Sequence, residues 1–205
     1  MSKYKKRFIG KDNGKSYQER VGHWPKYDFL TKNSIELANF LDSHKLLKDE
    51  INIFEMGSAG CRNLKYINDL NENVNLFAND LNKENSFKNM HNSIKNKVKF
   101  YESDTLSLVS ENEPDVDIDI LISSDHMMHI DKESVIEIID KIKDKWKPKY
   151  ILLRELFSKD GEETNRIWPR VYHEFNLEDV YELVDVGECS NMPEWYSLKL
   201  YKLID

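Results

Sequence analysis

The sequence predicts an α/β fold, a doubly wound and mostly parallel sheet with helices on both faces and an antiparallel strand at its C-terminal end. Three observations predict it. Short apolar runs alternate with segments of helical period, a glycine-containing turn joins the first strand to a helix, and the last two strands are too close in sequence for a crossover helix. A chain of 205 residues, 40% of them hydrophobic, supplies one full domain core.

The elements follow from apolar periodicity. The expected parallel strands are Ile51–Met56, Val74–Asn79, Val98–Glu102, Ile118–Ser123 and Tyr150–Leu153. The expected helices are Ser34–Leu47, Arg62–Leu70, Lys83–Ile94 and Lys132–Trp146. Tyr181–Val186 and Tyr196–Leu203 have strand patterns, and the short segment 187–194 between them predicts an antiparallel pair.

The composition restricts the partners and the cellular location that can be expected. The net charge of -7 argues against a broad nucleic-acid-binding face, although a local basic patch stays open. The basic start at 3–7 lacks a following apolar stretch, so neither a signal peptide nor a membrane partner is expected. Cys61 and Cys189 are too few for a disulfide framework. We therefore expect a cytoplasmic protein.

The turn after the first strand points to a nucleotide ligand. Glu55 ends the apolar run, and Gly57 and Gly60 follow before helical spacing resumes. Such a turn brings backbone N–H groups and the positive end of a helix beside a ligand. A pyrophosphate-binding turn needs a middle glycine that this one lacks, and Arg62 takes the place of its third glycine. Gly14-Lys15-Ser16 imitates the tail of a phosphate-clamping loop without the strand that should precede it.

In motif order, residues 34–205 resemble a class I S-adenosylmethionine-dependent methyltransferase. The resemblance implies a seven-stranded sheet whose last strand is inserted antiparallel. The family's first motif is matched by Glu55-Met-Gly57-Ser58-Ala59-Gly60, with Ala59 and Cys61 standing where glycines are common. Residues 1–33 are then expected to form an N-terminal arm or lid ahead of the methyltransferase domain.

The resemblance assigns a cofactor site for S-adenosylmethionine. Glu55 and the turn would meet the methionine half, Asp80 the ribose hydroxyls, and Asp104 the adenine amino group. Asp80 could instead cap the next helix, a role that Asn82 could also fill, and Asp104 could be a plain turn residue. The cofactor-binding residues expected in all are Glu55, Gly57, Ser58, Gly60, Asp80, Leu81, Asp104, Thr105, Ser123 and Ser124.

The fourth strand ends in the densest cluster of titratable groups, Asp125, His126 and His129, which are the predicted catalytic residues. His126 is the candidate base, because a hydroxyl or ring-nitrogen acceptor must lose a proton. In the family a histidine at the position of His129 often packs structurally. The cluster could also bind a metal, but the third protein ligand that zinc requires is unassigned, so no metal is predicted.

Substrate and lid residues are also predicted. The arm carries Tyr17, Arg20 and Trp24, which would close over the cofactor and exclude water, although the aromatic residues could equally anchor the arm to the surface. Glu155 could face the acceptor, or it and Arg154 could mark where the fifth strand meets solvent.

The acceptor is predicted to be a small molecule or a sugar. The fourth motif lacks the Asp/Asn-Pro-Pro-aromatic and Pro-Cys signatures of nucleic-acid methyltransferases. A looser similarity to methyltransferases of bacterial surface-sugar biosynthesis lies in Glu55 through Leu64, in 129–131 and in Trp195-Tyr196. Two alternatives stay open: a non-catalytic methyltransferase-like interaction protein and a nicotinamide-binding oxidoreductase. Nothing in the sequence decides the oligomeric state.

Overall fold

The computed structural model describes residues 28–156, 175–189 and 196–204. Seven strands form one sheet in the order β3-β2-β1-β4-β5-β7-β6. The strands are β1 (Asn52–Met56), β2 (Asn75–Asp80), β3 (Val98–Glu102), β4 (Ile120–Ser124), β5 (Tyr150–Leu156), β6 (Tyr181–Glu188) and β7 (Tyr196–Leu203). The first five are parallel, and β7 lies antiparallel between β5 and β6. The predicted seven-stranded fold with an inserted antiparallel strand is confirmed.

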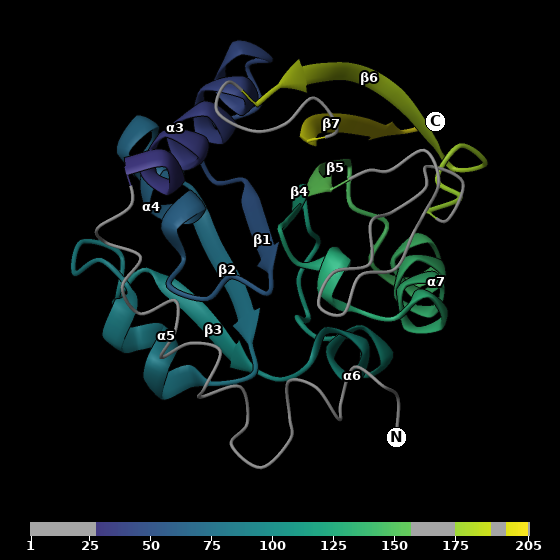
Figure 1. The fold of residues 1–205 in the computed structure, drawn as a ribbon, viewed down its shortest axis with the longest axis horizontal. Coiled ribbons are helices and arrows are strands. Elements are labelled where there is room, and N and C mark those ends of the chain that lie inside the picture. The colour runs from purple at the N-terminus through teal and green to yellow at the C-terminus, as the bar shows by residue number, and fades with distance from the viewer. Residues whose placement is uncertain (1–27, 157–174, 190–195, 205) are drawn as a thin grey trace.

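Helices cover both faces of the sheet (Figure 1). One face carries α3 (Asp28–Ser43), α4 (Arg62–Leu70) and the segment after α5 (Lys83–Asn89), and the other carries α6 (Thr105–Ser110) and α7 (Lys132–Lys141) with its π-helical continuation η3 (Ile142–Trp146). A single turn of 3-10 helix, η2 (Met127–His129), follows β4.

Each face packs its own core. Along β1, Ile53 joins the core beneath α3 and α4, whereas its neighbour Phe54 joins the core beneath α6 and α7. Both residues have no exposed surface. Because successive side chains of a strand point to opposite faces, a central parallel strand covered on both sides needs apolar residues at both positions. The continuous apolar runs of the sequence therefore reflect burial on two sides.

Several boundaries differ from those expected. The first helix begins at Asp28 and ends at Ser43, several residues earlier than the predicted 34–47. The helix expected over 83–94 ends at Asn89, and the short helix α6 was not expected. Strand β5 runs on to Leu156, so Arg154 and Glu155 belong to the sheet and are buried, 4% and 0% exposed. Their pairing with β7 prevents the exit to solvent that an isolated strand end would have.

Candidate active site

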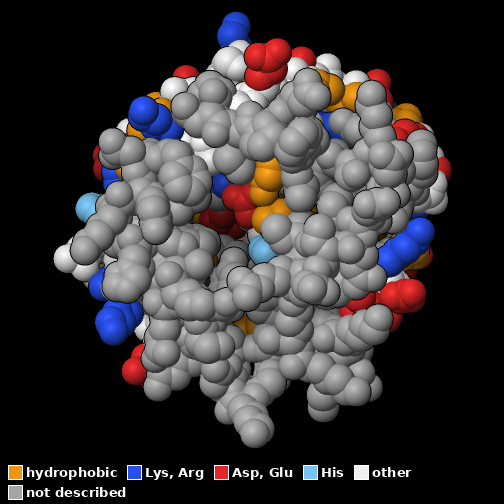
Figure 2. Space-filling view, viewed as in Figure 1, with side chains coloured by type: hydrophobic (Ala, Val, Ile, Leu, Met, Phe, Trp, Pro, Cys, Tyr) orange, Lys and Arg blue, Asp and Glu red, His pale blue; other side chains and the backbone are white. Residues whose placement is uncertain are grey.

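The sheet changes its direction of winding between β1 and β4. From β1 the chain first adds β2 and β3 on one side, and then β4 and β5 on the other. In open α/β sheets ligands bind at the carboxyl ends of the strands at this switch point. Figure 2 shows acidic side chains and a histidine in a hollow on this face of the molecule, near β1 and β4 of Figure 1.

The turn after β1 is held in left-handed backbone conformations. Gly57, Ala59 and Cys61 have φ angles of 59°, 46° and 53°. The two non-glycine residues that depart from the family motif thus adopt the conformation that glycine would take, at a cost of roughly 1–2 kcal/mol each. A Cβ on Gly57 would lie 2.0 Å from Nδ1 of His126. Glycine is required at Gly57 for both its φ and the close approach of this ring.

Glu55 lies beneath this turn, 2% exposed. Its Oε1 accepts a hydrogen bond of 2.6 Å from Nδ2 of Asn63 on α4. Its Oε2 is buried and has no hydrogen-bond partner among the described residues. Burial raises the pKa of Glu55 to about 7. One carboxylate oxygen is therefore left without a hydrogen bond among the described residues, at the point where the sequence predicted a cofactor contact.

The end of β2 holds the turn in place. Asp80 Oδ2 accepts from the backbone N–H of Ala59 at 3.0 Å. The neighbouring Asn79, 1% exposed, accepts from the N–H of Gly57 at 3.3 Å and donates to the carbonyl of Ser103 at 3.0 Å. Sequence reasoning missed Asn79, although an amide inside an apolar strand directly before the acid is a visible signal. Asn79 links the ends of β1, β2 and β3.

Helix capping separates the roles of the two acids. Asn82 caps α5 by accepting from the N–H of Asn85 at 3.0 Å. The capping role that competed for Asp80 is thus filled by Asn82, and the ribose role of Asp80 stays a prediction. Asp104 caps α6 by accepting from the N–H and hydroxyl of Ser107 at 3.0 and 2.7 Å. Its predicted contact with adenine is untested by these bonds.

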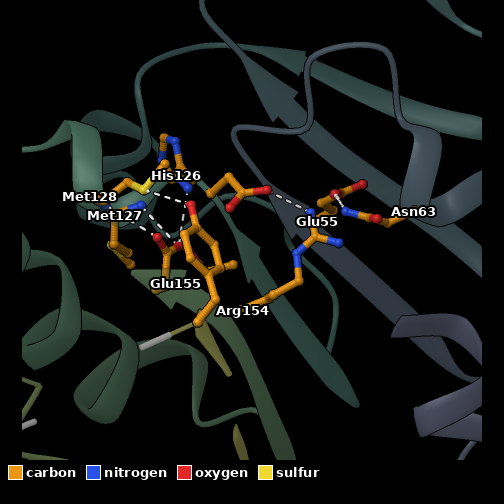
Figure 3. A network of polar contacts seen from close by, with 10 residues as sticks. Glu55, Asn63, His126, Met127, Met128, Arg154 and Glu155 are labelled. Carbon is orange, nitrogen blue, oxygen red and sulfur yellow. Dashed lines mark hydrogen bonds and ion pairs between the residues drawn. The ribbon is translucent and has the colours of Figure 1, made fainter. Parts of the chain in front are cut away.

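A buried carboxylate fixes the segment after β4 (Figure 3). Oε1 of Glu155 accepts from the hydroxyl of Ser123 at 2.6 Å and from the N–H groups of His126 and Met127 at 3.1 and 3.0 Å. Its Oε2 accepts from the N–H of Met128 at 3.3 Å. Both oxygens are occupied by the protein itself, so we interpret Glu155 as a positioning residue of this segment. A direct acceptor contact stays a prediction.

The ring of His126 lies between Thr105 at the start of α6 and Gly57 in the turn after β1. Its Nε2 lies 2.8 Å from Oγ1 of Thr105, and its ring faces Gly57. Burial, followed by the charge of His129, lowers the pKa of His126 to about 3. The imidazole is therefore neutral at physiological pH, and its Nε2 forms one hydrogen bond with the hydroxyl of Thr105. In this geometry it is a weak base.

Asp125, which directly follows β4, and Arg154 on β5 form a partly buried ion pair. Asp125 has a φ of 55°, and its Oδ2 accepts from Nη2 of Arg154 at 2.6 Å. The backbone N–H of Asp125 also donates to the carbonyl of Arg154 at 2.9 Å. Arg154 was not among the predicted site residues, because a strand pattern does not reveal which charged side chain turns inward.

The remaining predicted residues surround this centre. Ser58 is buried and donates to the carbonyl of Asn79, Gly60 packs against Asn89, and Leu81, Ser124 and His129 are half-buried. Tyr17, Arg20 and Trp24 lie outside the described residues. Within the described ranges, no three His, Cys, Asp or Glu side chains gather closely enough to hold a metal ion, and no helix is long and apolar enough to cross a membrane.

Comparison with solved structures identifies the fold. A magnesium protoporphyrin IX methyltransferase from Synechocystis PCC 6803 with bound SAM aligns over 97% of this chain and 85% of its own, at 12% identity and a TM-score of 0.62. The plantazolicin methyltransferase BpumL aligns over 98% and 94%, at 11% identity and a TM-score of 0.62. The protein has the methyltransferase fold.

A third solved structure is larger. An O-methyltransferase family protein from Burkholderia thailandensis aligns over 96% of this chain at 13% identity and a TM-score of 0.65, and this chain spans 61% of its length. At such identities the likeness is one of fold. No family model matches the sequence, and no curated protein matches it.

Proposed function

We propose that this protein is an S-adenosylmethionine-dependent methyltransferase that acts on a small-molecule or sugar acceptor. The observation that carries the proposal is the position of Glu55, Asp80 and Asp104 at the ends of three adjacent strands around one left-handed turn. The fold adds support, since solved structures with this fold were crystallised with SAM or SAH.

The residues present fit this cofactor. Oε2 of Glu55 is a buried acceptor without a partner among the described residues, and Gly57 adds no side chain to the turn beside it. Glu55 would hold the methionine half, Asp80 the ribose and Asp104 the adenine. When bound, S-adenosylmethionine supplies an electrophilic methyl group on sulfur.

The protein's own contribution is orientation. Glu155 fixes the backbone from His126 to Met128 by three N–H bonds, and Thr105 fixes the His126 ring. Holding an acceptor in line with a reacting carbon removes much of the entropic barrier of a bimolecular transfer. Because the pKa of His126 is lowered to about 3, we expect this residue to orient the acceptor by a hydrogen bond more than to store its proton.

The acceptor class rests on the sequence. The acidic balance and the absence of the nucleic-acid methyltransferase motifs argue for a small molecule or sugar. BpumL was crystallised with a monoazolic desmethylPZN analogue, and an O-methyltransferase family 2 protein from Planctomyces limnophilus was crystallised with apigenin. In those proteins this fold therefore binds small molecules. The cytoplasmic location stays a prediction from the sequence.

The experiment follows a labelled methyl group from S-adenosylmethionine into fractionated small molecules of the source cell. We expect label in a small-molecule fraction with the wild type, a loss of about 10- to 100-fold in Asp80→Ala, and no change in Asp144→Asn, which replaces an exposed acid on η3. His126→Ala should lower turnover and spare cofactor affinity. Cofactor binding without transfer into any fraction would favour the non-catalytic alternative.

A further inference from the structure

The guanidinium of Arg154 is only partly used by the protein. Its Nη2 donates to Oδ2 of Asp125 at 2.6 Å, while Nε and Nη1 are buried and have no hydrogen-bond partner among the described residues. Arg154 is 4% exposed, so bulk water does not satisfy these donors. Buried donors without an acceptor cost folding free energy, and a ligand oxygen that accepts from them can offset this cost.

Asp125 presents the opposite chemistry at the same place. Its Oδ2 is occupied by Arg154, whereas its Oδ1 is buried and accepts no hydrogen bond among the described residues. The ion pair is therefore joined through one oxygen and one nitrogen only. An acceptor atom and two donor atoms are left over on the two side chains.

A third polar group, from β7, lies beside this ion pair. The hydroxyl of Tyr196 donates to Sδ of Met128 at 3.3 Å, and a thioether sulfur is a weak acceptor. Burial, followed by the charge of Asp125, raises the pKa of Tyr196, so the phenol stays protonated near that carboxylate. A ligand oxygen can replace the sulfur as the partner of this hydroxyl at little cost.

We propose that Asp125, Arg154 and Tyr196 bind the hydroxyl groups of a neutral sugar or polyol acceptor. A hydroxyl both accepts and donates, so it can satisfy a free donor of Arg154 together with Oδ1 of Asp125. The ion pair is already neutral, and an anionic group would meet the carboxylates of Asp125 and Glu55, toward which Figure 3 shows the guanidinium of Arg154 turned. An ammonium group would leave the donors of Arg154 unsatisfied.

This acceptor class rests on the proposed function and makes it more specific. Asp125 directly follows β4, and the ring of the next residue, His126, faces Gly57 in the turn where we propose that the cofactor binds. Hydroxyl groups bound by Asp125 and Arg154 would therefore lie beside the cofactor, on the β4 and β5 side of the site.

Periodate tests the acceptor class, because it cleaves the bond between carbons that carry neighbouring hydroxyl groups. Extract of the source cell is treated with periodate, quenched with ethylene glycol, and then supplied with wild-type protein and labelled S-adenosylmethionine. We expect most of the label transfer to be lost, and extract that receives periodate quenched beforehand should keep it. Unchanged transfer after periodate would overturn the inference and leave the proposed function in place. No transfer into untreated extract would refute the proposed function, and the acceptor class with it.

Substitution of Arg154 tests the residues. Arg154→Met should raise the amount of extract needed for half-maximal transfer by about 10-fold, the value of one charge-assisted hydrogen bond, and leave the calorimetric affinity for S-adenosylhomocysteine unchanged. Lys48→Met, which removes an exposed cation, should change neither quantity. If folded Arg154→Met lost affinity for S-adenosylhomocysteine, its donors would belong to the cofactor and the inference would be overturned. An unchanged requirement for extract would overturn it as well.

Circular dichroism shows whether Arg154→Met is folded, since the substitution leaves Asp125 without its partner. If it is unfolded, Tyr196→Phe takes its place, because it removes one hydroxyl and keeps the ion pair. Tyr196→Phe should raise the amount of extract needed by about 5-fold, the value of one neutral hydrogen bond. A requirement equal to that of the wild type would contradict the proposed contact with the acceptor.

Discussion

Glu55 at the end of β1 and Glu155 at the end of β5 are both buried carboxylates at the same edge of the sheet, but on opposite faces. Glu155 accepts four hydrogen bonds, one from Ser123 on β4 and three from the segment after β4. Glu55 accepts one from Asn63, and its second oxygen has no partner among the described residues. Burial raises the pKa of both.

The difference distinguishes a carboxylate that builds the site from one that serves a ligand. A buried acid whose oxygens all accept hydrogen bonds within the protein stabilises a loop. A buried acid with one oxygen that lacks a hydrogen bond costs folding free energy, and a ligand that donates to that oxygen can offset the cost. By this criterion we expect Glu155 to maintain the shape of the site and Glu55 to contact a ligand within it. Substitutions of the two acids, changes of pH and a substitution in the turn each test this difference.

The largest effect is expected from truncating the two acids in parallel. Glu155→Ala leaves one hydroxyl and three N–H donors without their acceptor, so it should lower the free energy of unfolding by about 4 kcal/mol. Glu55→Ala removes the same atoms but leaves only the amide of Asn63 without its acceptor, so it should lower the free energy of unfolding by about 1–2 kcal/mol. Urea denaturation at pH 7 measures both. Equal losses would abolish the distinction between the two acids.

A smaller effect is expected from pH. The pKa of Glu55 rises from 4.5 to about 7 on folding, so the folded state binds its proton more tightly. This contribution to stability is present below pH 4.5 and is lost as pH rises through 7, roughly 3 kcal/mol in all. Relative to the wild type, Glu55→Gln should therefore become more stable between pH 4.5 and 7.5, as followed by urea denaturation. Glu111→Gln, which replaces an exposed acid, is the control. If the stability of both variants relative to the wild type changed with pH in the same way, the raised pKa of Glu55 would be contradicted.

The smallest effect is expected at the turn beside Glu55. Ala59 has a φ of 46°, so Ala59→Gly should relieve backbone strain and raise the free energy of unfolding by up to about 1 kcal/mol, part of the gain being offset by the freedom of glycine in the unfolded chain. The same change at Ala38 inside α3 should destabilise by about 1 kcal/mol. Thermal or urea unfolding of both variants checks the opposite signs. Destabilisation at both positions would show that the turn carries no relievable strain.

The sequence predicted the parts of this molecule that depend on local pattern. The strand and turn from Ile51 to Gly60, the acid at the end of β2 and the C-terminal antiparallel pair lie where expected, because each is encoded by neighbouring residues. Of the two residues that the sequence offered as the helix cap, Asp80 and Asn82, the structure uses Asn82.

The β4 and β5 side could not be predicted in this way. Glu155 binds groups 27 to 32 positions away, and Thr105 meets His126 across 21. A strand pattern gives the face of a side chain and not its partner. Arg154 looked like a residue at a solvent boundary because the extension of β5 depends on pairing with β7, which lies far along the chain.

The central claim is that the ends of β1 to β5 bind S-adenosylmethionine and its product. Isothermal titration of the wild-type protein with S-adenosylhomocysteine and, separately, with NAD tests it most directly. The site described here predicts saturable one-site binding of S-adenosylhomocysteine and no heat of binding with NAD. Binding of NAD without binding of S-adenosylhomocysteine would contradict the claim and support the oxidoreductase alternative.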